Sequence, residues 1–558
     1  MPDSYTAFKN KIGLTAGDEY VSENKEVVLV WPYKDCVLEG GMTKEDQKRD
    51  EIFYNETLAP DDINRLLDAK VFTNFKRIDE KGEHKLDGFN RDEKGTIKDN
   101  LIIKGNNLLA LASLKKEFAG KVKLIYIDPP YNTGGSAETF TYNNSFNHSS
   151  WLTFIKNRLE IGKYLLREDG YIAIAIDHME LFYLGCIADE VFGKENRIGL
   201  VTIVHKPEGR QHSKFFSPSN EYMLVYARNK VFAEFNQVVL LEEKKKEFTE
   251  KDSVGNFKWK NFIRGDVLKT DKDGGFYSIF VSKDLKNFSL LEMAGYSKVL
   301  PIDNVGNERA WIVLPAGFEK KLANGEIKAE INKHKKIEIF YKIREQQVFT
   351  THWVDKRYNF TAHGTNLLSK IIGEKSVSYP KSIYAVFDTL KIMTNKDDIV
   401  LDFFAGSGTT GHATLELNKE DSGHRSFILI EQLDEHIDVC IKRIKKVSED
   451  GTADFVYMEL AKWNEEWIEK IENAKTGKEL VKLWDGMKET AFLSYKVEPK
   501  TIDANAKDFA NLSIADQRRF LIECLDKNQL YINLSEMEDK EYGMSKEDKS
   551  LNNKFFIK

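Results

Sequence analysis

Short apolar runs alternate with longer amphipathic segments in two parts of this chain. Apolar runs bounded by polar turns are typical of strands buried on both faces of a sheet. The predicted strands are 122–128, 171–176 and 221–227 in the first part and 399–402, 427–431 and 454–458 in the second. The segments between them, such as 151–167, repeat apolar residues at helical spacing. This alternation predicts an α/β fold, with a doubly wound, Rossmann-like sheet built from two sequence blocks.

The alternation fades between residues 229 and 360, which predicts an inserted module. This segment holds 24 lysines and arginines against 19 aspartates and glutamates, a balance of +5, in a chain whose net charge is −6. A basic block favours contact with a polyanion, although a solvated surface of mixed charge would also explain it. The predicted domains are an N-terminal extension of polar and helical character (1–100), the first half of the core (101–228), the insert (229–360), the second half of the core (361–459) and a helical C-terminal region with a strand at 530–532 (460–558).

The overall composition is that of a globular protein, with 41% hydrophobic and 31% charged residues among 558. An uninterrupted apolar stretch near 18 residues is missing from the sequence, and its first residues lack a signal-peptide pattern. The four cysteines are far apart, so the sequence indicates neither a metal site nor a disulfide framework. We therefore predict a cytoplasmic protein.

The tetrapeptide Asp128-Pro129-Pro130-Tyr131 follows the apolar run 122–127 and is the most informative motif. The carboxylate can accept a hydrogen bond from an exocyclic amine, and the prolines stiffen the loop because their φ angles are fixed. The tyrosine ring offers a flat face on which a base can stack. These residues are suited to holding the amino group of a nucleobase. A rigid turn after a buried strand is the alternative reading.

A glycine loop follows the predicted strand 399–402 and is a candidate cofactor site. It reads Phe404-Ala405-Gly406-Ser407-Gly408 and is preceded by Asp402. Glycines allow a ligand to approach the backbone closely, and a helix start favours an anionic group. Glu431 ends the next predicted strand, at a spacing typical of an acidic residue that binds a ribose.

The two motifs together resemble those of the amino-group DNA methyltransferases that use S-adenosylmethionine. The catalytic motif precedes the cofactor motif, with a long insert between them, which is the order of the beta class. Further segments resemble the modification (Mod) subunits of type III restriction-modification systems, namely 31–35, 101–107, 146–148, 221–226 and 459–464. The resemblance implies S-adenosylmethionine as cofactor, bound by Asp402, Phe404, Gly406, Gly408 and Glu431, with further contacts at Lys381, Ser382 and Thr365.

The chemistry that we predict is methyl transfer to the N6 amine of an adenine flipped out of double-stranded DNA. Asp128 and the carbonyl of Pro129 would accept the two N–H groups, and Tyr131 would stack on the base. Cytosine N4 has the same geometric demand, but an aspartate in the first position of the motif favours adenine. Cytosine C5 chemistry needs a nucleophilic cysteine, typically after a proline, and the sequence has no Pro-Cys pair.

Two other classes of function remain as alternatives. A subunit that recognises DNA for a partner nuclease without catalysis would not need both motifs intact. An NAD-dependent Rossmann enzyme would use the glycine loop but leave Asp128-Pro129-Pro130-Tyr131 without a role.

The DNA contacts are predicted from the charge of two segments, and the assembly from the resemblance. The insert is the candidate target-recognition domain, and the polar loop 205–214 is a second DNA-facing candidate. The residues predicted to contact DNA are Lys258, Lys260 and Arg264 in the insert and Lys206 and Arg210 in the loop. The resemblance to Mod subunits implies a homodimer and a type III restriction (Res) subunit as partner. The region 460–558 is the candidate assembly region, because its large aromatic residues can anchor an interface; burial against the protein's own core is the alternative. The chain has no Gly-x-x-x-x-Gly-Lys-[Ser/Thr] loop for ATP.

Overall fold

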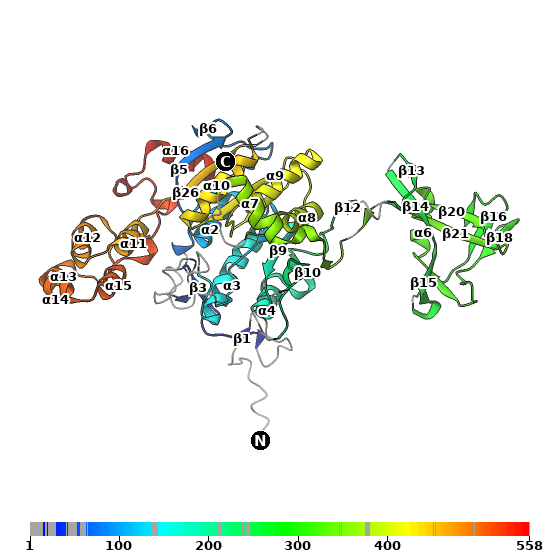
Figure 1. Ribbon diagram of the computed structural model, residues 1–558, viewed down its shortest axis with the longest axis horizontal. Coiled ribbons are helices and arrows are strands. Elements are labelled where there is room, and N and C mark those ends of the chain that lie inside the picture. Colours follow the sequence, from blue (N-terminus) through cyan, green and yellow to red (C-terminus); the bar gives the residue numbers. More distant parts are fainter. Residues whose placement is uncertain are drawn as a thin grey trace, which may run out of the picture. The chain divides into compact units, whose positions relative to one another are not determined.

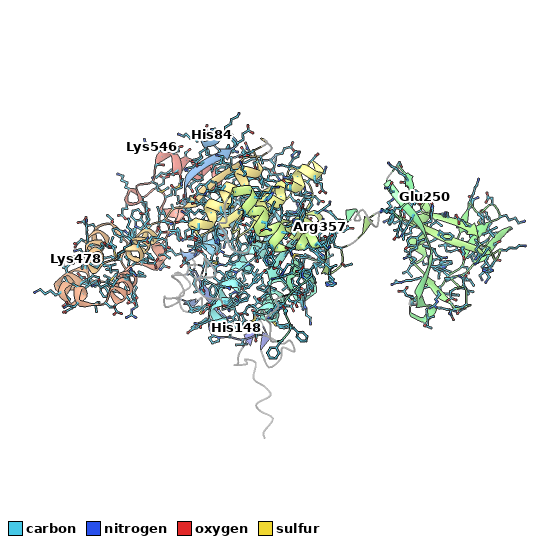
Figure 2. All side chains as sticks on the ribbon, viewed as in Figure 1. His84, His148, Glu250, Arg357, Lys478 and Lys546 are labelled. Carbon is cyan, nitrogen blue, oxygen red and sulfur yellow. The ribbon has the colours of Figure 1, made fainter. Side chains whose placement is uncertain are left out.

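The computed structural model describes residues 71–134, 143–209, 215–236, 246–373 and 380–556, apart from 254, 272, 345, 348, 450, 452 and 496, together with shorter pieces before residue 71 and at 238–239. The chain forms two compact units (Figure 1). The larger comprises residues 1–236 and 350–558, and the smaller comprises residues 237–349. Figure 2 marks His148 and Arg357 in the larger unit and Glu250 in the smaller one.

The larger unit is built around an 11-stranded sheet whose central strands are parallel. In spatial order these strands are β9 (Leu166–Ile176), β8 (Val122–Ile127), β24 (Ile399–Asp402), β25 (Ser426–Glu431), β7 (Leu101–Lys104) and β26 (Phe455–Leu460). Beyond β9 lie β11 (Asn220–Ala227), β10 (Arg197–Val204) and β23 (His352–Trp353), and beyond β26 lie β5 (Phe72–Asp79) and β6 (Gly82–Lys85). Every residue of β8 and β25 is buried, as expected of parallel strands covered on both faces.

Helices cover both faces of this sheet, because alternate residues of each strand point to opposite sides (Figure 1). In β7, Leu101 and Ile103 pack in a core with α2 and α3, whereas Ile102 packs in a second core with α9 and α10. The covering helices are α2 (Asn107–Phe118), α3 (His148–Leu165), α4 (Leu181–Phe192), α7 (Asn366–Ile372), α8 (Ile383–Met393), α9 (Thr409–Asp421) and α10 (Asp434–Val447). The predicted doubly wound α/β fold is confirmed.

The two sequence blocks meet at the centre of the sheet, where β8 and β24 are neighbours with Ile125 opposite Leu401. From β8 the chain continues through α3 to β9 on one side, and from β24 it continues through α9 to β25 on the other side. Strand order therefore reverses between β8 and β24. In open α/β sheets, ligands bind outside the carboxyl ends of the strands at such a switch point.

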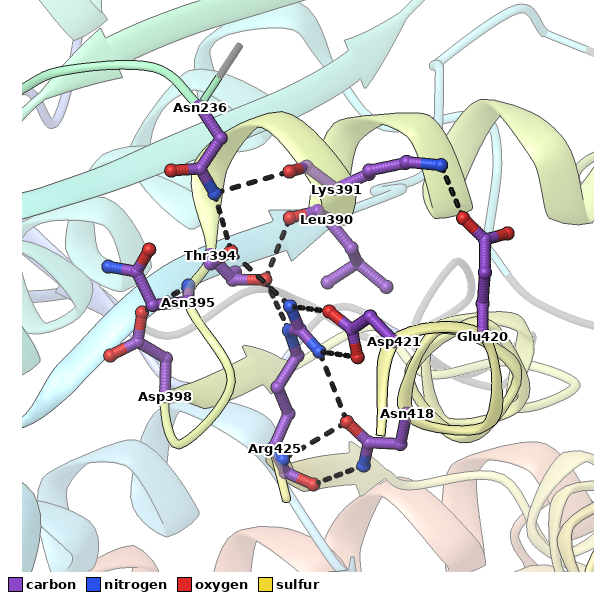
Figure 3. A network of polar contacts seen from close by, with 10 residues as sticks. All are labelled: Asn236, Leu390, Lys391, Thr394, Asn395, Asp398, Asn418, Glu420, Asp421 and Arg425. Carbon is purple, nitrogen blue, oxygen red and sulfur yellow. Dashed lines mark hydrogen bonds and ion pairs between the residues drawn. The ribbon is translucent and has the colours of Figure 1, made fainter. Parts of the chain in front are cut away.

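The chain leaves the larger unit at Asn236, which is anchored to the end of α8 (Figure 3). Its Nδ2 donates to the carbonyl of Thr394 at 2.8 Å and to that of Lys391 at 3.3 Å. Arg425, just before β25, donates from Nε to Thr394 Oγ1 at 2.8 Å and forms a two-pronged ion pair with Asp421 of α9, at 3.0 and 2.8 Å. This network joins α8, α9 and β25 to the residue at which the insert departs.

The smaller unit has its own core and lies within the segment predicted as an insert. Phe262, Trp311 and Phe318 are completely buried in it. Its four-stranded antiparallel sheet contains β13 (Glu250–Asp252), β14 (Gly255–Asn261), β21 (Ile337–Arg344) and β20 (Ile327–Ile331). The remaining elements are β12 (Val238–Val239) with β22 (Gln346–Gln347), β15 (Ile263–Leu268) with β19 (Arg309–Trp311), β16 (Ile279–Ser282) with β17 (Phe288–Ser289) and β18 (Tyr296–Val299), and α6 (Pro315–Ala323). A separate core is the mark of a domain that can fold by itself.

The C-terminal region is helical, as predicted. Its helices are α11 (Asn464–Asn473), α12 (Gly477–Thr490), α13 (Pro499–Ala504), α14 (Ala506–Asn511), α15 (Ile514–Cys524) and α16 (Lys546–Phe556). The strand predicted at 530–532 is wrong, because Tyr531 forms only an isolated bridge with Lys462. None of the described helices is long and apolar enough to cross a membrane.

The helical character predicted for residues 1–100 is wrong for much of the part that the structure describes. The segment 72–85 forms β5 and β6, which extend the central sheet beyond β26. The reason is tertiary pairing. The edge of β26 offers unpaired backbone groups, and a polar segment with one buried face can satisfy them.

Candidate active site

A pocket lies at the switch point between β8 and β24. Its empty space, the solvent-open mouth included, is about 670 Å³. The predicted residues that line it are Asp128, Pro130, Lys381, Asp402, Phe404, Gly406 and Glu431. A wider, more open groove between α11 and α12 contains none of the motif residues, so we assign the chemistry to the pocket at the switch point.

The loop after β8 is held by side chains of two neighbouring segments. Trp151 of α3 is completely buried, and its Nε1 donates to the carbonyl of Pro130 at 2.8 Å. Asn132 adopts a left-handed backbone with φ of 55°, and its Nδ2 donates to Glu180 at 2.8 Å. Asparagine tolerates this conformation better than most residues. The proline pair and these anchors hold Asp128 at the pocket.

Two residues of the predicted catalytic motif, Asp128 and Tyr131, form a cluster with two other polar side chains. Lys381 Nζ lies 3.3 Å from Asp128 Oδ1 and also contacts the carboxylate of Glu221 and the hydroxyl of Tyr131. The hydroxyl of Tyr131 donates to Glu221 Oε2 at 3.2 Å. Lys381 comes from the segment before α8 and Glu221 from β11, so three separate parts of the chain form the cluster.

The charges in this cluster are tuned by burial and by one another. Burial raises the pKa of Asp128, and the ammonium of Lys381 opposes this effect. Burial disfavours the charged form of Lys381, but Asp128 and Glu221 together raise its pKa above the ordinary value. When all three groups are ionised, the cluster has an excess of one negative charge. Such a site favours a ligand or reacting group that carries a positive charge.

The glycine loop after β24 is organised by Asp402. Its Oδ1 accepts from the backbone N–H of Phe404 at 3.0 Å, and its Oδ2 accepts from the hydroxyl of Thr410 at 2.5 Å. Burial, against which these hydrogen bonds act, raises the pKa of Asp402 to about 7. Asp402 therefore closes the loop from strand end to helix start and also lines the pocket.

Gly406 and Gly408 both have left-handed backbones, with φ of 51° and 77°. They differ in what surrounds them. A Cβ on Gly408 would lie 2.8 Å from Cys440 Sγ of α10, whereas a Cβ on Gly406 would meet only the carbonyl of Phe404, at 3.9 Å. Gly406 lines the pocket and Gly408 does not. Gly408 is thus required where the start of α9 packs on α10.

Arg443 of α10 forms hydrogen bonds with the same loop. It is completely buried and donates to Thr409 Oγ1 at 2.8 Å and to Ser407 Oγ at 3.1 Å. Burial lowers the pKa of this guanidinium to about 10. Desolvating a cation is costly, so its hydrogen bonds fix the loop tightly.

Glu431 also borders the pocket, and both of its carboxylate oxygens accept from the backbone. Oε2 accepts from Gly406 N at 2.8 Å, and Oε1 accepts from Gln432 N at 2.9 Å and Leu433 N at 3.0 Å. The side chain therefore joins the end of β25 to the glycine loop. Its contact with a ribose stays a prediction.

The three remaining residues predicted to contact the cofactor lie in different surroundings. Lys381 lines the pocket but points its ammonium at the Asp128 loop. Ser382 donates to the carbonyl of Arg357 at 2.7 Å and is outside the lining. Thr365 ends the π-helical turn Thr361–Thr365 and is also outside it.

The residues predicted to contact DNA are distributed over both units. Lys258 and Lys260 lie in β14, Arg264 lies in β15, Lys206 follows β10, and Arg210 is outside the described residues. Lys258 forms an ion pair with Glu247, and Arg264 Nε lies 3.5 Å from Asp266 Oδ1. Lys260 and Arg264 are exposed. Their contacts with DNA stay predictions.

Two important residues were not among the predicted site residues. Glu221 is a single acidic residue at the start of an apolar strand, where its burial requires a partner. That charge in an otherwise apolar run was the available signal. Arg443 gave no signal, because a helix with charged residues normally exposes them.

The fold and the site are typical of one class of protein: an α/β protein whose pocket, at the carboxyl ends of its parallel strands, is lined by a glycine loop and a carboxylate. Residues 122–442 match the family described as DNA methylase, and the chain belongs to this family.

The chain is also similar to several individual proteins. Over 99% of its length the chain is 31% identical to a Haemophilus influenzae protein described as a probable type III restriction-modification enzyme HindVI Mod subunit, of which 88% is covered. It is 32% identical over 62% of its length to the type III EcoPI Mod subunit of Escherichia phage P1, of which 59% is covered. Among solved structures, the cytosine-N4-specific PvuII DNA methyltransferase is 12% identical, covers 63% of this chain and 89% of its own, and has a TM-score of 0.30.

The chain is therefore a DNA methyltransferase, as predicted. The methyl donor that the motifs predict is S-adenosylmethionine. The pocket fits this cofactor. Its excess of negative charge complements the positive sulfonium, and the space beside Gly406 is open to the backbone. Asp402, Phe404, Gly406 and Glu431 are the residues that would hold it.

Proposed function

We propose that this chain methylates the N6 amine of adenine in double-stranded DNA, as the modification subunit of a type III restriction-modification system. The observation that carries the proposal is that Asp128 lines the pocket at the switch point together with the glycine loop, while Lys381 contacts both Asp128 and Tyr131. The aspartate in the first position of the motif favours adenine over cytosine. Similarity to a Mod subunit over nearly the whole chain supports the type III assignment.

The residues of this chain align the amine. Adenine N6 is a poor nucleophile because its lone pair is delocalised into the ring. Asp128 accepts one N–H and the Pro129 carbonyl accepts the other, which favours a pyramidal nitrogen. Tyr131 stacks on the base and fixes its plane. S-adenosylmethionine, when bound, supplies the methyl group as an electrophile. The bond from sulfur to the methyl group breaks as the bond from nitrogen to it forms, its electron pair stays on sulfur, and the nitrogen loses one proton to solvent. Alignment provides much of the acceleration.

We assign target recognition to the unit 237–349. It has its own core, and Lys260 and Arg264 are exposed on it. Basic side chains that contact phosphates hold a protein in register, while contacts to base edges provide specificity.

The proposed assembly is a homodimer that associates with a restriction (Res) subunit in the cytoplasm. The similarity to Mod subunits of restriction-modification enzymes supports a partner subunit, and the homodimer stays a prediction. Light scattering on the full-length protein at micromolar concentration tests the dimer, and a monomer would contradict it.

Digestion of methylated DNA to nucleosides, followed by mass spectrometry, tests the reaction. The purified protein, S-adenosylmethionine and mixed-sequence duplex DNA should yield N6-methyladenine, and an Asp128→Ala variant should yield none. N4-methylcytosine would replace the adenine assignment with the cytosine alternative. DNA binding without any methylated base would favour the non-catalytic recognition subunit. Long-read mapping of the methylated sites would then give the recognition sequence.

A further inference from the structure

We propose that Lys381 is a positioning residue for methyl transfer, which acts with Glu221 to fix Asp128 and Tyr131. This assignment replaces the cofactor contact expected for Lys381. It rests on the proposed function, because it requires that Asp128 and Tyr131 act on the target amine.

The geometry of the ammonium carries this inference. Lys381 Nζ lies 3.3 Å from Asp128 Oδ1 and also contacts Glu221 and the hydroxyl of Tyr131. An ammonium has three N–H donors, so these three oxygens can use all of them. Glu221 in turn accepts from Tyr131 at 3.2 Å. Lys381 therefore contacts each of the other three members, and Tyr131 and Glu221 also contact each other.

The approach of Lys381 to Tyr131 leaves the ring face available. Nζ contacts the hydroxyl and lies 4.6 Å from the ring centroid, so it reaches the ring from its hydroxyl edge. A base can stack on the face of Tyr131 while the edge stays anchored. About 30% of the Asp128 side chain is exposed, so the carboxylate remains accessible to a target amine.

Burial makes the ion pair between Lys381 and Glu221 rigid. Only 10% of the Lys381 side chain and 11% of the Glu221 side chain are exposed, so neither charge can exchange its partner for water at low cost. The backbone of Lys381 is also fixed, because Gly364 packs so closely that a Cβ there would lie 2.3 Å from the carbonyl of Pro380. A buried ion pair on a fixed backbone orients the groups that it contacts.

Orientation of this kind affects rate more than affinity. A misplacement of about 1 Å in a reacting geometry can cost roughly 100-fold in rate. Asp128 contributes to catalysis only if its carboxylate faces the amine, and Tyr131 only if its ring plane is set. Lys381 controls both from one atom.

The test compares Lys381→Met, which keeps the apolar stem and removes the ammonium, with Lys391→Met as a matched control. Lys391 lies on α8, and its ammonium pairs with Glu420 outside the site. Single-turnover methylation is measured with saturating S-adenosylmethionine and DNA, and cofactor affinity is measured by calorimetry. We expect Lys381→Met to lower the rate about 100-fold and to change the cofactor dissociation constant less than about threefold. Lys391→Met should match the wild type in both.

Glu221→Gln and the double variant that combines it with Lys381→Met extend the test. They keep it informative if Lys381→Met alone does not fold. If Lys381→Met is unstable because it leaves Glu221 buried without its cation, the double variant removes that charge as well. We expect the double variant to fold and to be no slower than the slower single variant, because both residues act through one cluster.

Three outcomes would overturn the inference. A rate for Lys381→Met within about threefold of the wild type would show that positioning does not need the ammonium. A loss of cofactor affinity with an unchanged saturated rate would restore the cofactor contact. Additive rate losses in the double variant would show that Lys381 and Glu221 act separately. A wild type without any methylation activity would instead contradict the proposed function itself, and the inference with it.

Discussion

Asp128 has to meet two opposing requirements. In the proposed reaction its ionised form is the stronger acceptor for the N–H of an amine, yet it lies in surroundings that favour its neutral form, since burial raises its pKa. Lys381 resolves the conflict by placing a positive charge 3.3 Å from Oδ1. Because the pKa of Lys381 is itself raised by the two carboxylates, the ammonium stays charged across the pH range in which Asp128 titrates.

The first prediction concerns Asp128→Ala. Methyl transfer should fall to background, because the carboxylate acts on the target amine, while cofactor and DNA binding should be largely kept. Asp177→Ala is a matched control, since Asp177 follows the end of the neighbouring strand β9 and its Oδ1 accepts from Met179 N at 2.8 Å. Turnover by Asp128→Ala above about a tenth of the wild-type value, roughly 1.4 kcal/mol, would contradict the catalytic role.

The second prediction concerns Asp402 and the pH dependence of stability. Its folded-state pKa is raised to about 7, so the folded protein keeps a proton that the unfolded chain releases at lower pH. The free energy of unfolding should therefore decrease as pH rises from about 4 to about 7. Between about pH 5 and pH 7, wild type should lose about 2 kcal/mol more than Asp402→Asn. Denaturant unfolding of both proteins at the two pH values measures this difference, and parallel pH profiles would refute it.

At the scale of elements, the decisive feature is the turn from β24 into α9. The chain leaves a buried strand and starts a helix within a few residues, and two of these residues take left-handed backbones. Asp402 and Arg443 hold the turn from its two ends with hydrogen bonds. The loop can therefore offer backbone to a cofactor without ordering itself on binding.

The third prediction separates the roles of the two glycines in this turn. Alanine at either position costs roughly 1–2 kcal/mol for its left-handed backbone. Gly408→Ala should cost more, because its Cβ would also lie 2.8 Å from Cys440 Sγ. Gly406→Ala should instead weaken S-adenosylmethionine binding, since this residue lines the pocket. Denaturant unfolding and calorimetry of the two variants provide the comparison, and equal losses of stability would disprove the packing role of Gly408.

At the scale of the whole molecule, helix α16 and the segment from β5 to α2 contribute to one core, although they are far apart in the sequence. Phe555 and Phe556 of α16 pack with Phe72 of β5, and Phe555 also contacts Phe89 and Phe118. The last helix is therefore part of the methyltransferase core. Several aromatic residues of the C-terminal region, such as Trp463 and Phe492, pack against Tyr542 in the same way.

The fourth prediction tests this closure of the core. Phe555 is completely buried, so Phe555→Ala should lower the free energy of unfolding by about 3–5 kcal/mol. Tyr495→Ala is the control in the same region, because 92% of Tyr495 is exposed, and it should change stability by less than about 0.5 kcal/mol. Urea unfolding measures both. A loss below about 1 kcal/mol for Phe555→Ala would mean that α16 is peripheral.

The fifth prediction concerns recognition. Replacing residues 237–349 with the corresponding unit of a relative should transfer sequence specificity and leave the chemistry unchanged, because this unit has its own core. The junctions fall after Asn236, which is anchored on α8, and before Thr350. Long-read methylation mapping of DNA treated with the chimera reads the outcome. An active chimera that keeps its original site would place recognition in the larger unit.

Much of the fold and both motifs could be predicted from the sequence, because they depend on local patterns. The apolar run 122–127 is long enough and flanked well enough to identify β8, and the glycine loop after 399–402 needs backbone conformations that only a few residues adopt. Whether each core segment is a strand, a helix or a loop is therefore determined by its own short stretch of sequence. The resemblance to DNA methyltransferases rests on the same short motifs.

The tertiary structure alone decided which residues meet. Glu221 and Lys381 are far apart in the sequence, and only the packing of β11 and the segment before α8 around the Asp128 loop brings their charges together. The same holds for 72–85, a polar segment that became two strands because β26 offered an edge. Local propensities are weak compared with the cost of leaving buried charges and backbone groups without partners, and those partners are chosen by the fold.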